Sequence, residues 1–415
     1  MALWIWNSPS WPTLAYDAAA LAAPASAARL ALERLVAKAE ALAGGDALRA
    51  ERDVWSGAAT ATAAIEGESL PLASVRSSVA RRLGLPPDEG IAIPRSVEGL
   101  LDVLENATAA WHEPLTDARV RRWQASLFPA GGSALRTLAV GQYRSSPEPM
   151  QIVSGPVGRE TVHYEALPSS AVSAEMAAFL EWFERTRDGA LDGVLRAGLA
   201  HVWFESIHPF EDGNGRVGRA IVDLALAQAL RNPTRLHGIS TQIERERDAY
   251  YRALNEAQRG SGDVTQWLAW FAGALERACV RSLALVEESL ARAKFWAEHS
   301  HVALNERQRK ALNRMLEAGP GRFDGGLTAR KYIGMTGASP ATASRDLADL
   351  VEKRLLVPGR RRGRSAYYDL AMPGWEWQPE RCDRYERGAG EHRGERDERG
   401  ERRALLARIA VSEGA

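Results

Sequence analysis

Residues 208–219 read His-Pro-Phe-Glu-Asp-Gly-Asn-Gly-Arg-Val-Gly-Arg and separate two largely apolar segments. Residues 199–207 have the composition of a buried helix, and Pro209 prevents that helix from continuing. A second helical pattern begins at about Arg216. The fold must therefore join two core helices by a tight loop. This arrangement places a histidine at the end of the first helix and two arginines at the start of the second.

The loop between these helices favours the binding of a polyphosphate. Gly213 and Gly215 can adopt positive φ and let phosphate oxygens approach the N–H groups at a helix N-terminus, and Asn214 tolerates the same conformation. Arg216 and Arg219 are three residues apart and so share one face of the helix. Two positive charges in a first helical turn oppose the helix dipole, which indicates a bound polyanion.

The same stretch contains a base and a candidate metal ligand. His208 can take up a proton near neutral pH, and Asp212 offers a hard oxygen ligand for Mg²⁺ that bridges phosphates. No Lys-Ser or Lys-Thr pair follows Gly215, so the loop is not a P-loop. An apolar helix precedes it instead of a strand, which excludes a dinucleotide-binding fingerprint.

Composition indicates a globular protein of two or three domains. The 415 residues are 45% hydrophobic and 26% charged, with a formal net charge of zero, which excludes a chain that is a polycation throughout. Cys279 and Cys382 are too few and too far apart for a disulfide framework or a zinc site. We find neither a signal peptide nor a membrane-spanning segment. We therefore expect a cytoplasmic protein without a membrane partner.

Most of the chain has helical periodicity, so the expected fold class is mainly α. Expected helices occupy residues 32–42, 47–65, 172–187, 191–207, 216–230, 245–258 and 263–300, with several more between 72 and 138. Residues 150–154 and 161–165 alternate in polarity around a turn sequence, and they predict the only β-hairpin before residue 320.

Two features stand out before residue 70. Trp4, Trp6 and Trp11 are expected to pin an extended segment to a core, with stacking on a ligand as the alternative. The helix expected at 47–65 is rich in small residues, which would allow close packing against another helix. It ends at Glu66, where the helix dipole disfavours a negative charge, so we expect a cationic partner for Glu66 elsewhere in the fold.

A separate unit is expected near the C-terminus. Helices at 306–317, 328–333 and 339–353, followed by strands at 355–357 and 365–369, predict a winged helix-turn-helix domain. Residues 301–370 contain 14 Lys and Arg against 7 Asp and Glu. This domain could bind DNA or another protein. The candidate DNA contacts are Arg345, Arg360, Arg361, Arg362 and Arg364.

The stretch from His208 to Arg219 matches the full motif of the Fic family, and the chain resembles that family over roughly residues 1–370. The resemblance implies a helical core with a β-hairpin flap beside the active site, here at residues 150–165. It also implies a protein adenylyltransferase. Such an enzyme moves AMP from ATP to a Ser, Thr or Tyr hydroxyl of a target protein or of itself and releases pyrophosphate.

The resemblance gives each motif residue a role. His208 would deprotonate the target hydroxyl, and Asp212 would hold Mg²⁺ on the α- and β-phosphates. Gly213, Asn214 and Gly215 would form the anion hole. Arg216 would bind the β-phosphate and Arg219 the γ-phosphate, while the hairpin would hold the target segment by strand addition.

Two further segments resemble the family. Residues 62–67, Thr-Ala-Ala-Ile-Glu-Gly, match its inhibitory pattern, in the class where the inhibitory helix precedes the core. Glu66 would pair with Arg219 and so exclude the γ-phosphate. Residues 250–258 resemble the helix that closes the adenine pocket, which makes Tyr251 and Gln258 nucleotide-binding candidates.

Two alternative functions stay open at this point. The chain could be a DNA-binding regulator whose core senses ATP or modifies itself. It could also remove AMP from targets, because a carboxylate at Glu66 could orient an attacking water. A homodimer is a further candidate assembly. The expected domains are 1–95 (with the inhibitory helix at about 47–67), the catalytic core 96–290, the winged helix 301–370 and a disordered charged tail 378–415.

Overall fold

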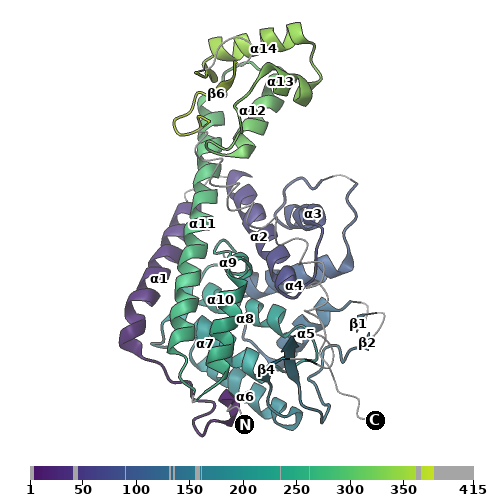
Figure 1. The fold of residues 1–415 in the computed structure, drawn as a ribbon, viewed down its shortest axis with the longest axis vertical. Coiled ribbons are helices and arrows are strands. Elements are labelled where there is room, and N and C mark those ends of the chain that lie inside the picture. The colour runs from purple at the N-terminus through teal and green to yellow at the C-terminus, as the bar shows by residue number, and fades with distance from the viewer. Residues whose placement is uncertain are drawn as a thin grey trace. The chain divides into compact units, whose positions relative to one another are not determined.

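The computed structural model describes residues 4–40, 45–88, 90–129, 132–133, 136–154, 159, 161–233, 235–260, 262–360 and 366–377. Contacts divide the chain into two compact units, whose described parts are 4–286 and 287–377 (Figure 1). The predicted tail at 378–415 lies outside the described residues. Within the described residues, no helix has the length and apolar character needed to cross a membrane.

The first unit is built mainly of helices, in agreement with the expected fold class. Its elements are η1 (Ile5–Asn7), α1 (Ala18–Glu40), α2 (Gly45–Ile65), α3 (Leu72–Arg82), α4 (Arg95–Ala109), α5 (Asp117–Leu127), α6 (Ser169–Arg185), α7 (Gly193–Ile207), α8 (Asn214–Leu230), α9 (Ile239–Arg245), α10 (Arg247–Gln258) and the first part of α11 (Thr265–Glu298). The sequence did not predict α9, because seven residues are too few for a clear period.

The core of this unit is the pair α7 and α8. Every residue of α7 from Val194 to Ile207 is buried, so this helix is surrounded by protein on all sides. Its close approach to α8 depends on Gly218, where a Cβ would lie 2.5 Å from Oε1 of Glu205. The predicted order of helix, loop and helix is therefore realised at the centre of the unit.

Two short antiparallel strand pairs lie beside the helices. Strand β3 (Gln151–Ser154) pairs with β4 (Thr161–Glu165), with Gln151 opposite Glu165 and an irregularity after Ile152. These strands confirm a β-hairpin at the predicted residues. The expectation that it is the only one before residue 320 is wrong, because β1 (Gly132–Ser133) pairs with β2 (Arg136–Thr137). Two-residue strands are too short to produce an alternating pattern.

Two of the three N-terminal tryptophans, Trp4 and Trp6, lie against the β3–β4 hairpin. The Trp6 indole donates to the carbonyl of Glu165 at 2.7 Å, and Trp4 packs edge-on against Tyr164 with ring centroids 5.4 Å apart. The Trp11 indole donates to Glu175 on α6 at 2.9 Å. All three indoles are thus engaged in packing or hydrogen bonds within the protein, which favours anchoring over ligand stacking.

The second unit contains the elements in the order expected for a winged helix. After the end of α11 come α12 (Glu306–Ala318), α13 (Ala329–Thr336), α14 (Pro340–Glu352) and the antiparallel strands β5 (Leu356–Pro358) and β6 (Tyr368–Leu370). Ser339 caps α14 by accepting from the N–H of Thr342, with Pro340 at the first helical position. Gly337, at φ 69°, makes the turn between α13 and α14.

Candidate active site

The end of α7 presents His208. This residue follows Ile207 with φ 49° and ψ 60°, a left-handed conformation that is uncommon for a residue with a side chain. Its side chain is 15% exposed, and Nδ1 lies 3.9 Å from Oε2 of Glu205. The chain reverses at His208, so the imidazole lies at the edge of the loop that leads to α8.

The carbonyls at the end of α7 are bonded by side chains from other elements. The Arg144 guanidinium, 5% exposed, donates to the carbonyls of Ile207 (3.3 Å), His208 (2.8 Å) and Leu167. The Tyr164 hydroxyl donates to the Ser206 carbonyl at 2.6 Å. These bonds satisfy acceptors that a helix end leaves open, and they stabilise the strained conformation of His208. Sequence reasoning missed Arg144, which lies far from the motif along the chain.

The two titratable groups at this helix end are both held in their neutral forms. Burial, reinforced by the charge of Arg144, lowers the pKa of His208 to about 4. Burial, reinforced by the charge of Glu66, raises the pKa of Glu205 to about 8. At neutral pH His208 is therefore an unprotonated imidazole, the form that can accept a proton.

The glycine loop differs in detail from the prediction. Gly213 directly precedes α8 and has φ 89°, a conformation that favours glycine, as predicted. Asn214 and Gly215, however, are the first residues of the helix, which begins two residues earlier than expected. The Asn214 side chain does not face outward but bonds both backbone groups of Phe210, at 2.9 and 2.8 Å, and so closes the loop.

Gly215 is needed for space and not for its φ angle. A Cβ at this position would lie 2.1 Å from Oε1 of Glu66 and 3.0 Å from Nη1 of Arg219. Any side chain would displace one of these charged groups. The position therefore depends on how closely the end of α2 approaches α8.

Arg219 is held by the last turn of α2. Its guanidinium, 1% exposed, donates from Nη2 to Oε1 of Glu66 at 2.9 Å. It also donates to the hydroxyl of Thr62 at 2.5 Å and to the Thr62 carbonyl at 2.9 Å. Thr62 and Glu66 are four residues apart and so lie on one face of α2, which accounts for their spacing.

Glu66 is ionised in this position. Burial acts to raise its pKa, but the charges of Arg219 and Arg216 and the hydrogen bond from Arg219 together lower it below the usual value. The predicted cationic partner is thus present, in a partly buried and charge-assisted contact.

Arg216 has a carboxylate partner that sequence reasoning missed. Nη1 of Arg216 donates to both oxygens of Glu68, at 2.9 and 3.0 Å. Its Nη2 lies 3.4 Å from Oδ1 of Asp212, and its guanidinium stacks over Phe128 at 5.0 Å. Nothing in the local sequence distinguishes Glu68 from an ordinary polar residue after a helix.

The predicted adenine-side residues lie on α10. Tyr251 donates to the carbonyl of Ile65 at 3.3 Å, and Arg247 donates to the same carbonyl at 2.6 Å. Gln258 is buried at the end of this helix. Tyr251 therefore contacts the end of α2 in this structure, next to Glu66, and Arg247 is an additional contact that the sequence did not predict.

Asp212 is the candidate metal ligand at this loop. Among the described residues, no group of three or more His, Cys, Asp or Glu side chains is arranged to hold an ion. Asp212 is 46% exposed at the loop, and one of its oxygens already accepts from the Gly213 N–H at 2.6 Å. One accessible carboxylate fits Mg²⁺, which usually takes one or two carboxylates and completes its shell with water and substrate phosphates.

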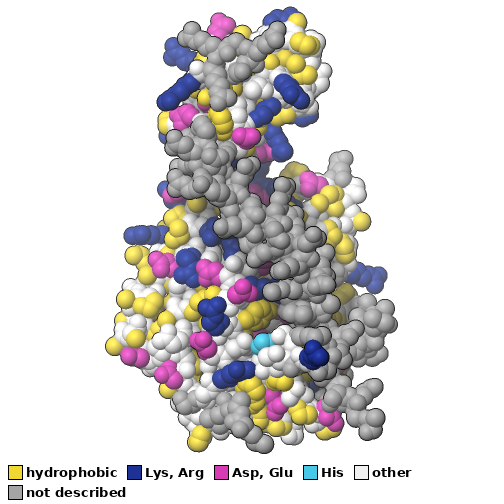
Figure 2. Space-filling model, viewed as in Figure 1, with side chains coloured by type: hydrophobic (Ala, Val, Ile, Leu, Met, Phe, Trp, Pro, Cys, Tyr) yellow, Lys and Arg dark blue, Asp and Glu magenta, His cyan; other side chains and the backbone are white. Residues whose placement is uncertain are grey.

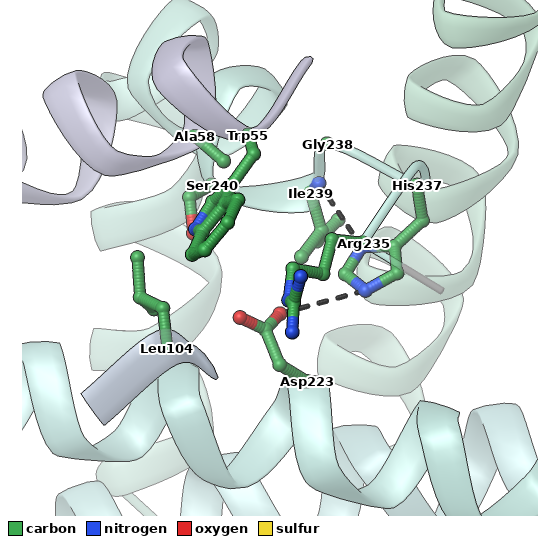
Figure 3. A pocket seen from close by; sticks show the side chains of 9 residues that line it. All are labelled: Trp55, Ala58, Leu104, Asp223, Arg235, His237, Gly238, Ile239 and Ser240. Atoms are coloured by element: carbon green, nitrogen blue, oxygen red, sulfur yellow. Dashed lines mark hydrogen bonds and ion pairs between the residues drawn. The ribbon is translucent and has the colours of Figure 1, made fainter. Parts of the chain in front are cut away.

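A small cavity is lined by residues of α2, α4, α8 and α9 and of the segment before α9. Its lining includes Trp55 of α2, Asp223 of α8 and Arg235 (Figure 3). Arg235 stacks over Trp55 at 4.2 Å and pairs with Glu51 at 3.3 Å, and His237 lies 3.5 Å from Asp223. These contacts hold the middle of α2 against α8 and α9.

The predicted DNA contacts are described only in part. Arg345 on α14 and Arg360 after β5 are exposed. Arg361, Arg362 and Arg364 lie outside the described residues. Lys and Arg side chains are spread over the drawn face of this unit (Figure 2).

Comparisons with known proteins give two family matches. Residues 114–226 match the Fic/DOC family, and residues 4–85 match a domain of unknown function, DUF4172. A probable protein adenylyltransferase of Aquifex aeolicus is 32% identical over 101 residues, which cover 24% of this chain and 28% of that protein. The protein adenylyltransferase Fic of Nematostella vectensis is 26% identical over 223 residues, 52% of this chain and 45% of that protein.

The chain thus matches less than half the length of these two relatives. Among solved structures, a Fic family protein from Desulfovibrio desulfuricans is similar with a TM-score of 0.49 and 20% identity, covering 87% of this chain and 98% of that one. His208, Arg216 and Arg219 all lie within residues 114–226, the range that is similar to the Fic/DOC family.

Proposed function

We propose that this protein transfers AMP from ATP to a hydroxyl side chain of a target protein and of itself. The observation that carries the proposal is the placement of a neutral His208 and two buried arginines around one glycine loop. The names of the two relatives, both adenylyltransferases, support the same reaction.

The proposed chemistry follows from the groups present. The target hydroxyl oxygen attacks the α-phosphorus of ATP, and the bond from that phosphorus to the oxygen bridging the β-phosphate breaks, so pyrophosphate leaves. The hydroxyl proton goes to Nε2 of His208, because Nδ1 faces Glu205. Arg216 and Arg219 bind the β- and γ-phosphates, and the N-terminus of α8 adds backbone donors.

Mg²⁺ would be held by Asp212 and the phosphates, where it would neutralise the charge on the departing pyrophosphate. The β3–β4 hairpin would bind the target segment by strand addition. Its β4 edge is occupied in part by Arg259, which donates to the carbonyls of Val162 (2.9 Å) and His163 (3.1 Å).

In this proposal Glu66 inhibits the enzyme, because it occupies the arginine that the γ-phosphate needs. The Glu66–Arg219 pair is partly buried, with Arg219 almost fully enclosed, and Thr62 supports it, so we expect it to exceed the ~0–1 kcal/mol of an exposed pair. A contribution of about 1.4 kcal/mol would already reduce productive ATP binding tenfold.

The test is self-labelling with tagged ATP and Mg²⁺. Glu66→Gly is expected to raise labelling about tenfold or more, and adding His208→Ala in that background is expected to abolish it while ATP still binds. His112→Ala, at an exposed histidine, is the matched control. Labelling that does not rise in the Glu66 variant would refute inhibition, and transfer at an unchanged rate without His208 would exclude it as the base.

A second candidate function, DNA binding, is supported by the exposed face of α14. Ala341, Ser344, Arg345 and Ala348 form one exposed stripe, while Ala343, Asp346, Leu347 and Leu350 face the core. Small side chains around one arginine fit the major groove of duplex DNA.

The pairing of acidic residues in the second unit also supports DNA binding. Two of its acidic residues are already paired internally, Asp346 with Arg307 at 2.9 Å and Asp349 with Lys353 at 2.6 Å. Binding of a fluorescent duplex should weaken steeply with salt and fall when Arg345 is replaced by alanine, but not when Arg314 on α12 is. A duplex that does not bind at low salt would instead favour a protein partner.

A further inference from the structure

The turn after α2 places two carboxylates, Glu66 and Glu68, on the arginines of α8. We infer that Glu68 competes with the β-phosphate of a nucleotide for Arg216, in the same way that Glu66 competes with the γ-phosphate for Arg219. The inference rests on the proposed function, because the phosphate assigned to each arginine comes from it.

The geometry of the contact is that of an anion bound to a prepared site. Both oxygens of Glu68 accept from Arg216, at 2.9 and 3.0 Å. Arg216 is 4% exposed, whereas the Glu68 side chain is 45% exposed. A buried guanidinium requires a counter-charge, but the half-exposed carboxylate can move into water at low cost. A phosphate oxygen can therefore replace Glu68 without leaving Arg216 unpaired.

The conformation at the end of α2 explains why both carboxylates reach α8. Gly67 has φ 79°, its N–H bonds the carbonyl of Ala64, and the N–H of Glu68 bonds the carbonyl of Ala63, each at 3.0 Å. These two bonds form a Schellman motif, which turns the chain back on itself directly after Glu66. Glu66 and Glu68 thus flank the turn and meet two arginines that are three residues apart on α8.

Other residues keep this turn next to the loop. Arg247 and Tyr251 of α10 both donate to the carbonyl of Ile65, at 2.6 and 3.3 Å. The turn is consequently held from α10 through the backbone carbonyl of Ile65, while its two carboxylates contact α8. Loss of either carboxylate pair leaves the turn itself attached.

The arginines retain unused donors. Nε of Arg216 and Nη1 of Arg219 are buried and have no hydrogen-bond partner among the described residues. An unpaired buried donor is unfavourable, so the present pairing with carboxylates is incomplete. A phosphate group, which has more acceptor oxygens than a carboxylate, can bond these remaining N–H groups as well.

ADP and ATP distinguish the two carboxylates, because ADP has a β-phosphate but no γ-phosphate. Dissociation constants for both nucleotides with Mg²⁺ would be measured by calorimetry on the full chain. Glu68→Gln is expected to tighten ADP and ATP about three- to tenfold. Glu66→Gly is expected to tighten ATP and leave ADP nearly unchanged, and the double variant should bind ATP most tightly.

A matched control removes a comparable Glu–Arg pair elsewhere. Glu288→Gln breaks the ion pair of Glu288 with Arg322 in the second unit and should change neither constant. AMP, which lacks both outer phosphates, should bind all variants equally. Glu68→Ala gives a second test in case glutamine still accepts from Arg216.

The outcomes separate this inference from the proposed function. If neither Glu68 variant tightens ADP, while Glu66→Gly still tightens ATP and raises transfer, the role of Glu68 is refuted and the proposed function stands. If ATP binds no variant, including Glu66→Gly, both are refuted. Since binding is measured directly, tighter ADP binding supports the role of Glu68 even where no AMP transfer is detected.

Discussion

Two helix ends meet at the candidate active site, and they are built in different ways. The end of α7 presents His208, and the end of α2 presents Glu66 and Glu68. At both helix ends the chain turns through a residue in the left-handed conformation, His208 at φ 49° after α7 and Gly67 at φ 79° after α2. The first is stabilised from outside by buried side chains, whereas the second forms its turn with its own backbone.

The difference lies in what holds each end. The carbonyls after α7 are bonded by Arg144 and Tyr164, which no ligand can replace because they lie inside the core. The carboxylates after α2 contact arginines whose charge a phosphate can satisfy equally well. In the proposed mechanism, the end of α7 would hold the base permanently, whereas the carboxylates after α2 would occupy the ligand site reversibly.

The largest effect is expected when a side chain that holds the end of α7 is removed. Arg144→Met should lower transfer in the Glu66→Gly background on the order of 10²-fold, because small displacements of a catalytic group have effects of that size. The charge of Arg144 also helps to lower the pKa of His208 to about 4. Its removal should therefore raise that pKa and move the acid limb of the pH–rate profile to higher pH.

A matched control exists in the same core. Arg196 is also buried, but it lies near the start of α7, far from His208 along the helix. It also donates to a backbone carbonyl, that of Phe183 on α6, at 2.7 Å. Arg196→Met should lower stability without moving the acid limb. If both variants shift the profile equally, Arg144 has no specific effect on His208.

An intermediate effect is expected from a change in the turn after α2, whose carboxylates a phosphate could replace. Gly67→Ala should strain the left-handed position by about 1 kcal/mol and so weaken both carboxylate pairs. We expect basal self-labelling to rise about fivefold, together with a small decrease in melting temperature. Gly84, at φ 69° with open space around it, is the control, since alanine there should lower stability but leave labelling unchanged.

The smallest effect on transfer is expected from a change at Glu205, which lies in the last turn of α7. Burial raises its pKa to about 8, well above its ordinary value of 4.5, so the folded protein binds this proton more tightly than the unfolded chain does. The resulting stability is complete below about pH 4.5 and is lost as the pH rises towards 8.

Glu205→Gln keeps the neutral form at every pH. The melting temperature should therefore fall less steeply between pH 5 and 8.5 for this variant than for the unchanged protein. Equal slopes would contradict the buried, protonated state of Glu205. Transfer at neutral pH should change little, because glutamine keeps a neutral polar side chain at the position that Nδ1 of His208 faces.

The sequence alone predicted much of the helical architecture and the site motif. Pro209, the glycines after Asp212 and the apolar segments on either side require a helix, a loop and a second helix, because each signal acts within a few residues. The position of Glu66 at the end of a helix also predicted a cationic partner, since its charge opposes the helix dipole.

Only the tertiary structure decided which groups surround those residues. Arg144 and Glu68 are 64 and 148 residues from their partners at the site, and no local pattern marks either one. The use of Gly215 for space, not for φ, follows from the close approach of Glu66 at the end of α2. Propensity and periodicity act locally, whereas burial and charge pairing depend on which segments the fold brings together.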